Sequence, residues 1–94
     1  MKRTTFYVYS DPGHSWVKVP ITFLTKVVGL QWRRHFTCFS YERGAYVYLE
    51  EDKDARTFID WCRAAGTEPV LRHCYYRRTD RPSRIRSYAP LAPL

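Results

Sequence analysis

The stretch FTCFSYERGAYVYLE, residues 36–50, decides the expected fold. Two segments rich in aromatic and β-branched residues, 36–41 and 45–50, flank the short sequence Glu42, Arg43 and Gly44. A three-residue hairpin loop needs positive φ at one position, and glycine adopts it without steric cost. The stretch therefore predicts a β-hairpin in which Gly44 closes the loop.

The residues before this hairpin predict two strands and a short helix. Residues 4–9 (TTFYVY) have the composition of a strand, and residues 16–19 alternate as a shorter one. Pro20 suits the first turn of a helix, Gly29 suits its end, and residues 30–35 read as a basic connector. The apolar face of this helix consists of Ile21, Leu24, Val27 and Val28.

The residues after the hairpin predict a second helix and a fifth strand. The acidic run 50–54 places carboxylates in a first helical turn, with Asp52 as the expected N-cap and Gly66 as the terminator. The run could also recruit Mg²⁺, but a helix start accounts for it. Residues 70–76 follow Pro69 and read as a strand. The apolar residues at helical spacing are Ala55, Phe58, Ile59, Cys62 and Ala65.

From residue 79 the chain reads TDRPSRIRSYAPLAPL, which is rich in proline and arginine and has no hydrophobic period. We expect a single α+β domain over residues 1–78 and an extended C-terminal arm over residues 79–94. The predicted element order is ββαββαβ. Short connections favour an antiparallel sheet with both helices on one face.

Charge and cysteine content narrow the class of partner. The 94 residues carry 16 Lys and Arg against 9 Asp and Glu, a net charge of +7 that favours nucleic acid, a ribonucleoprotein or an acidic protein surface. The alternative is that the positive charge only keeps the protein soluble and has no partner. No apolar stretch reaches the roughly 20 residues that cross a membrane, and the N-terminus lacks the apolar core of a signal peptide. We therefore expect a cytoplasmic protein with reduced thiols.

The segment SDPGH, residues 10–14, offers two interpretations. Asp11, Pro12 and Gly13 match a type II turn, in which Gly13 has positive φ. Alternatively, Asp11 orients His14 as a general base of a small hydrolase, but the sequence provides no nucleophile or pocket for it. We expect a turn and no enzymatic activity.

The histidines and cysteines of the sequence do not have the spacing of paired metal ligands. The candidate ligands form no CxxC, HxxxH or CxxH pair, so we expect neither a metal nor another cofactor. Cys38 and Cys62 read as small core residues. The candidates are His14, His35, Cys38, Cys62, His73 and Cys74.

The most informative pattern is the alternation of aromatic rings along the strands. One face is expected to pack on the helices through Phe6, Val8, Phe36, Cys38, Val47 and Leu49. The opposite face then carries Tyr7, Tyr9, Thr37, Phe39, Tyr41, Tyr46 and Tyr48. Arginines lie close to this face in sequence. The predicted binding residues are Tyr7, Tyr9, Arg43, Tyr46, Tyr48, Arg72, Arg77, Arg78, Arg81, Arg84 and Arg86.

Rings beside guanidinium groups suit single-stranded nucleic acid, because bases stack on the rings while phosphates pair with the cations. Tyrosine and arginine are also enriched at protein interfaces. In a third arrangement the arm folds over this face and buries its tyrosines beneath apolar residues. Those residues would be Ile85, Tyr88, Leu91 and Leu94.

Four segments resemble a group of small uncharacterised proteins from tailed bacteriophages and prophages. They are residues 10–16 (SDPGHSW), 40–44 (SYERG), 48–55 (YLEED with Asp54 and Ala55) and 85–88 (IRSY). The resemblance implies a phage origin but no activity, because the group has no assigned site residues. Residues 32–35 and the closing Ala-Pro-Leu repeats are outside it.

These observations favour a small basic phage protein that acts by stoichiometric binding. Its expected target is nucleic-acid-handling machinery of the bacterial host, bound in the manner of an inhibitor such as an anti-CRISPR protein. The alternative is direct, weakly sequence-specific binding of single-stranded nucleic acid. A hydrolase that depends on His14 is the third hypothesis.

Overall fold

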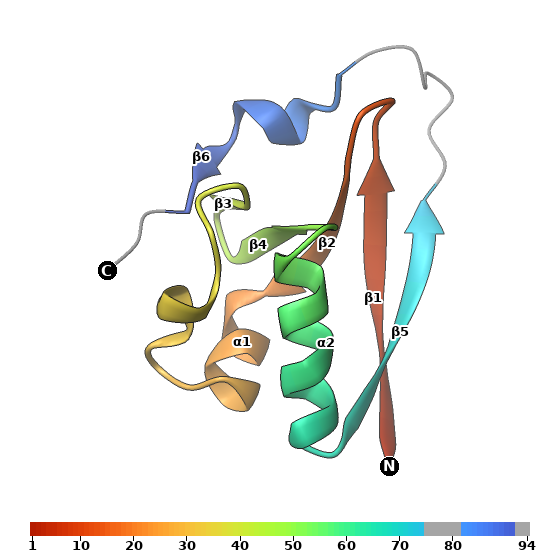
Figure 1. Ribbon diagram of the computed structural model, residues 1–94, viewed down its shortest axis with the longest axis vertical. Helices are drawn as coiled ribbons and strands as arrows, with labels where there is room; N and C mark the ends of the chain where they lie inside the picture. Colours follow the sequence, from red (N-terminus) through yellow and green to blue (C-terminus); the bar gives the residue numbers. More distant parts are fainter. Residues whose placement is uncertain (75–81, 92–94) are drawn as a thin grey trace.

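Within residues 1–74 and 82–91, which the computed structural model describes, six strands form one sheet in the order β5-β1-β2-β4-β3-β6 (Figure 1). The strands are β1 (Lys2–Ser10), β2 (Ser15–Pro20), β3 (Tyr41–Arg43), β4 (Tyr46–Glu50), β5 (Thr67–Cys74) and β6 (Ala89–Pro90). The helices are α1 (Ile21–Val27) and α2 (Asp54–Ala64), with 3₁₀ turns η1 (Trp32–His35) and η2 (Arg84–Ser87). The predicted single-domain α+β class is confirmed.

The sheet is mixed, so the prediction of an antiparallel sheet was wrong for one strand. β5 runs parallel to β1, from the pair Lys2 and Thr67 to the pair Tyr9 and Cys74. The cause is α2, which carries the chain back along the sheet between β4 and β5 and therefore makes these two strands parallel. β4 and β1 are both antiparallel to β2, so they run in the same direction. β5 has the direction of β4 and is therefore parallel to β1, with which it pairs at the edge of the sheet.

β5 begins at Thr67, before the predicted start at residue 70. The carbonyl of Gly66 accepts a hydrogen bond from the Lys2 N–H at 3.2 Å, so residue 66 directs its backbone groups at β1. Backbone direction alternates along a strand, and Pro69 therefore faces the open edge, where its missing N–H removes no bond to β1. Residues 75 and 76 of the predicted strand lie outside the described residues.

The predicted hairpin is present but shorter than expected. Arg43 pairs with Tyr46, so the loop consists of two residues, and Gly44 has a φ of 60° at its first position. Residues 36–40 do not extend β3, because they turn around the carboxylate of Asp54. Consequently Thr37 and Phe39 do not lie on the predicted tyrosine face.

The helix-side core contains most of the residues that alternation assigned to it. Leu24 of α1 and Phe58 of α2 are fully buried in the same cluster, so both helices cover one face of the sheet (Figure 1). Phe6 and Phe58 meet edge to face with ring centroids 5.0 Å apart. Burial raises the pKa of the Cys62 thiol to about 11. Cys38 is exposed, which corrects its predicted place in the core.

Helix α2 begins with a different cap from the one predicted. The N-cap is Lys53, which makes no side-chain cap bond, and Asp52 takes no part as a cap. Instead the Glu50 carboxylate accepts hydrogen bonds from the N–H groups of Asp52, Lys53 and Asp54, at 2.7–2.8 Å. Burial alone would raise the pKa of Glu50, but these three bonds outweigh it and the pKa is lowered.

The described part of the C-terminal arm, residues 82–91, belongs to the fold. β6 pairs with β3 and so extends the sheet at that edge; in Figure 1, η2 and β6 are the blue segments, and β6 lies beside β3. Leu91 is 3% exposed within the helix-side core, and its N–H donates to the carbonyl of Ser40. None of the described helices is long and apolar enough to cross a membrane.

Candidate nucleic-acid interface

The carboxylate of Asp11 joins the β1–β2 loop to the arm. It accepts hydrogen bonds from the N–H of Ser83 at 2.9 Å and from the guanidinium of Arg86 at 2.5 and 3.0 Å. The Asp11 side chain is only 2% exposed. The Arg86 guanidinium holds the pKa of Asp11 well below its usual range. Asp11 is therefore a structural anion that fixes the arm.

The loop itself is a turn, as predicted, but not of type II. Gly13 does not have positive φ. Instead the Asp11 side chain accepts the N–H groups of Gly13 and His14 at 3.0 Å each, and so replaces a backbone acceptor. The hydrogen bond of Asp11 to His14 is with the backbone N–H, and the ring Nδ1 of His14 lies 4.0 Å from a carboxylate oxygen of Glu51.

Replacing Gly13 with alanine is expected to weaken the Asp11–Arg86 contact. A Cβ at Gly13 would lie 2.9 Å from Nη2 of Arg86, closer than carbon and nitrogen approach without a shift. We expect the free energy of unfolding in urea to fall by up to about 1 kcal/mol. Lys26→Ala, at an exposed position away from the loop, is the control. Equal stability of the two variants would show that Arg86 moves aside freely.

The arm covers part of the tyrosine face. Ile85, Trp16 and Tyr48 form a second buried cluster, 3%, 2% and 8% exposed respectively. Tyr9, Tyr41 and Tyr88 pack against it. The arrangement in which the arm buries tyrosines therefore holds for Tyr48, through Ile85 and Tyr88. Leu91 instead enters the helix-side core, and Leu94 lies outside the described residues.

The remainder of this face stays open and carries cations among rings. Across the strands, Arg72 pairs with Tyr7 and Tyr7 pairs with Lys18, so the three side chains share one face. Tyr7 is 46% and Tyr46 39% exposed. The Lys18 ammonium lies 4.2 Å from the centroid of the Tyr46 ring. We call this surface the open strip; it consists of Tyr7, Lys18, Arg43, Tyr46 and Arg72.

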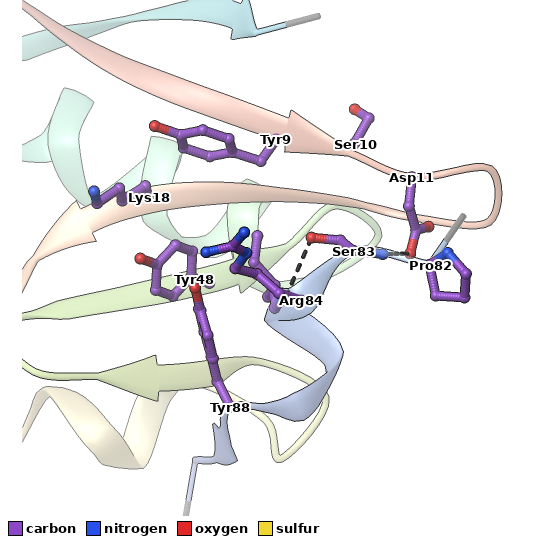
Figure 2. Close-up of a pocket in the computed structure, with 10 residues that line it drawn as sticks. Tyr9, Ser10, Asp11, Lys18, Tyr48, Pro82, Ser83, Arg84 and Tyr88 are labelled. Atoms are coloured by element: carbon purple, nitrogen blue, oxygen red, sulfur yellow. Dashed lines mark hydrogen bonds between the residues drawn. The ribbon is translucent and has the colours of Figure 1, made fainter. Parts of the chain in front are cut away.

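A pocket of about 450 Å³ adjoins the open strip where the arm crosses the sheet (Figure 2). We call it the arm pocket. Figure 2 shows the Arg84 side chain extending from η2 toward Tyr48. Burial raises the pKa of Tyr48 and of Tyr9, where the Cys74 thiol adds to the effect, so both hydroxyls remain protonated at neutral pH. The residues that line the arm pocket include Tyr9, Lys18, Tyr48, Ser83, Arg84 and Tyr88.

The electrostatic balance of the arm pocket is positive. Asp11 lines the pocket, but its charge is compensated by Arg86. Among residues 1–74 and 82–91, neither Lys18 nor Arg84 lies within ion-pair distance of a carboxylate. Two cations are thus available to an anion at this place.

The predicted binding residues divide into several groups. Tyr7, Arg43, Tyr46 and Arg72 belong to the open strip, whereas Tyr9, Tyr48 and Arg84 line the arm pocket. The guanidinium of Arg86 is engaged by Asp11 and serves structure instead. Arg77, Arg78 and Arg81 lie outside the described residues.

Sequence reasoning overlooked Lys18 and Ser83, and it named Tyr88 only as a residue of the arm that would cover the tyrosine face. Lys18 was accessible from the sequence, because it alternates with Val17 and Val19 and so had to share a face with Trp16. Ser83 and Tyr88 carried no local signal. Their place depends on where the arm docks.

Rings, protonated hydroxyls and cations on one face can bind phosphates and stack bases. The described part of the chain holds no group of three His, Cys, Asp or Glu that could ligate a metal ion. Comparisons with protein-family models, curated proteins and solved structures gave no match. The function therefore has to be argued from this surface.

Proposed function

We propose that this protein acts by stoichiometric binding and that its partner presents phosphates and unstacked bases. The partner is nucleic acid, either alone or held by nucleic-acid-handling machinery of the host. The observation that carries this proposal is the open strip, in which exposed tyrosines alternate with cations beside the arm pocket.

The strip has the chemistry that single strands require. Stacking of a base on an aromatic ring contributes about 1–3 kcal/mol, and Tyr7 and Tyr46 are the exposed rings that can provide it. Arg72, Tyr7 and Lys18 follow one another at the interstrand spacing of about 5 Å. A chain that crosses the strands would therefore meet a cation, a ring and a second cation in succession.

The resemblance to small phage proteins supports a setting inside an infected bacterium. A protein of this kind would act on a host complex that holds nucleic acid, in the manner of an anti-defence inhibitor. In that setting the open strip would bind the nucleic-acid strand that the host complex needs, and the protein would compete with the complex for that strand. Catalysis has no part in this proposal.

Binding of a fluorescently labelled single-stranded oligonucleotide, followed by anisotropy, tests the proposal. Affinity should fall steeply between about 50 and 200 mM salt, and Arg43→Ala with Arg72→Ala should lower the log–log slope by about 0.7 for each phosphate that the variant no longer neutralises. Arg34→Ala with Arg56→Ala removes the same charge from other exposed positions and is the matched control. Equal affinity and slope in the two double variants would refute the strip as the binding surface.

A pulldown from bacterial lysate with and without nuclease identifies the kind of partner. A partner that nuclease releases supports the proposal. A single host protein that stays bound after nuclease treatment, with affinity independent of Tyr7 and Tyr46, would overturn it in favour of an acidic protein surface.

A further inference from the structure

The arm pocket has the size of a small-ligand site. Its volume of about 450 Å³ is within the range of roughly 300–1,000 Å³ that is usual for such sites. The sheet forms one wall and η2 with Tyr88 forms the other (Figure 2). Both walls are held in place, because Asp11 bonds to Ser83 and Arg86 at the end of the pocket.

The cations of the pocket select an anionic group. Arg84 and Lys18 come from opposite walls, and among the described residues neither has a carboxylate partner. Ser83 adds a hydroxyl: its oxygen accepts the N–H of Ile85, and within residues 1–74 and 82–91 its proton has no acceptor, so it can donate to a ligand. A phosphate, with several acceptor oxygens, satisfies such a set better than a single carboxylate does.

The rings of the pocket select a flat group beside that anion. Tyr48 and Tyr88 are in direct contact, with ring centroids 5.1 Å apart and planes inclined by 56°, and because Tyr48 is only 8% exposed, Tyr88 is the more accessible ring of the two. Tyr9 faces the pocket from β1 (Figure 2). Tyrosine faces stack on nucleobases of any identity, so this wall favours a base without specifying which.

We propose that the arm pocket binds one phosphorylated nucleotide unit, with its phosphate between Arg84 and Lys18 and its base against the rings of Tyr9 and Tyr88. The inference rests on the proposed function where that unit belongs to a nucleic-acid strand. The same chemistry accommodates a free nucleotide. A nucleic-acid strand bound in the pocket would also contact the open strip, whereas a free nucleotide would not.

Isothermal titration with adenosine 5′-monophosphate tests the pocket directly. We expect saturable binding with one ligand per chain, at least tenfold tighter than that of adenosine or inorganic phosphate alone. Arg84→Ala should weaken this binding at least tenfold, while Arg84→Lys should retain part of it. Arg72→Ala, which removes an exposed strip residue of β5 that does not line the pocket, should leave it unchanged. Because Arg84 is exposed, these variants are expected to fold, which thermal unfolding checks.

The outcomes separate this inference from the proposed function. Oligonucleotide binding that depends on the strip, together with no binding of the mononucleotide, would overturn the pocket inference and leave the proposed function standing. Mononucleotide binding lost in Arg84→Ala without any oligonucleotide binding would establish the pocket as a site for free nucleotides and overturn the proposed function. Mononucleotide binding that Arg84→Ala leaves intact would refute the assignment of Arg84 to the phosphate.

Discussion

Replacing Asp54 with alanine is expected to lower the free energy of unfolding by about 3–5 kcal/mol, because it leaves one buried and two half-buried donors without their acceptor. Asp54 is fully buried at the start of α2. Its carboxylate accepts the N–H of Thr37 at 2.9 Å, the hydroxyl of Thr37 at 2.8 Å and the hydroxyl of Ser40 at 2.5 Å. The variant would leave these donors unsatisfied and release residues 36–40 from the helix.

The matched control is Asp60→Ala on the same helix. The Asp60 side chain is 65% exposed and lies 3.8 Å from Arg56, so its loss should change stability by no more than about 0.5 kcal/mol. Asp54→Asn keeps the volume and one acceptor oxygen and should lose less stability than alanine. Urea titration followed by circular dichroism measures all three. A loss in Asp54→Ala no greater than in Asp60→Ala would contradict this role.

The same carboxylate explains where sequence reasoning about the fold failed. Residues 36–40 have strand composition, but strand propensity is weak and context-dependent, and it lost to the hydrogen bonds that Asp54 offers. Periodicity predicted α2 itself well, since Phe58 and Cys62 recur on one face and both are buried. The parallel direction of β5 was also within reach of the sequence, because a helix between two strands of one sheet usually joins strands that run parallel.

The candidate site was predicted less completely than the fold. Alternation placed Tyr7 and Tyr46 on the open face, because the period of a strand is a local property. The contact of Asp11 with Arg86 spans 75 positions, and no local pattern encodes it. Since that contact positions η2, the arm pocket became visible only in the folded chain.

Replacing Asp11 with alanine is expected to free the arm and to lower the free energy of unfolding by about 2–3 kcal/mol. The buried carboxylate serves the N–H groups of Gly13, His14 and Ser83, which would lose their acceptor. Arg86 is 37% exposed and the bonds from the N–H groups of Gly13 and His14 are also exposed, so water compensates part of these losses and the part-buried N–H of Ser83 loses most. Exchange of the amide hydrogens of residues 83–91 should accelerate more than that of β1.

Tryptophan fluorescence gives a second measure of the freed arm. Trp16 is 2% exposed because Ile85 packs on it, and release of the arm should bring it into water and shift its emission to longer wavelength. Asp52→Ala, at an exposed carboxylate of the opposite helix-side surface, should shift neither the emission nor the exchange. An unchanged emission in a destabilised Asp11→Ala variant would mean that apolar contacts alone hold the arm.

The pH dependence of the free energy of unfolding distinguishes the contribution of the Asp11 charge from that of the shape of its side chain. Arg86 lowers the pKa of Asp11 in the folded state, so the carboxylate stabilises the fold above the pKa of a free aspartate, about 4, and this contribution is lost as the pH falls toward the lower folded value. Wild type should therefore exceed Asp11→Asn in stability most strongly above about pH 5, and the difference should shrink below about pH 4. Glu50, whose pKa is also lowered, titrates in both proteins and cancels from the comparison. A difference that stays constant from neutral to acid pH would show that Asp11 acts as a neutral hydrogen-bond acceptor and that its ion pair with Arg86 contributes nothing to holding the arm.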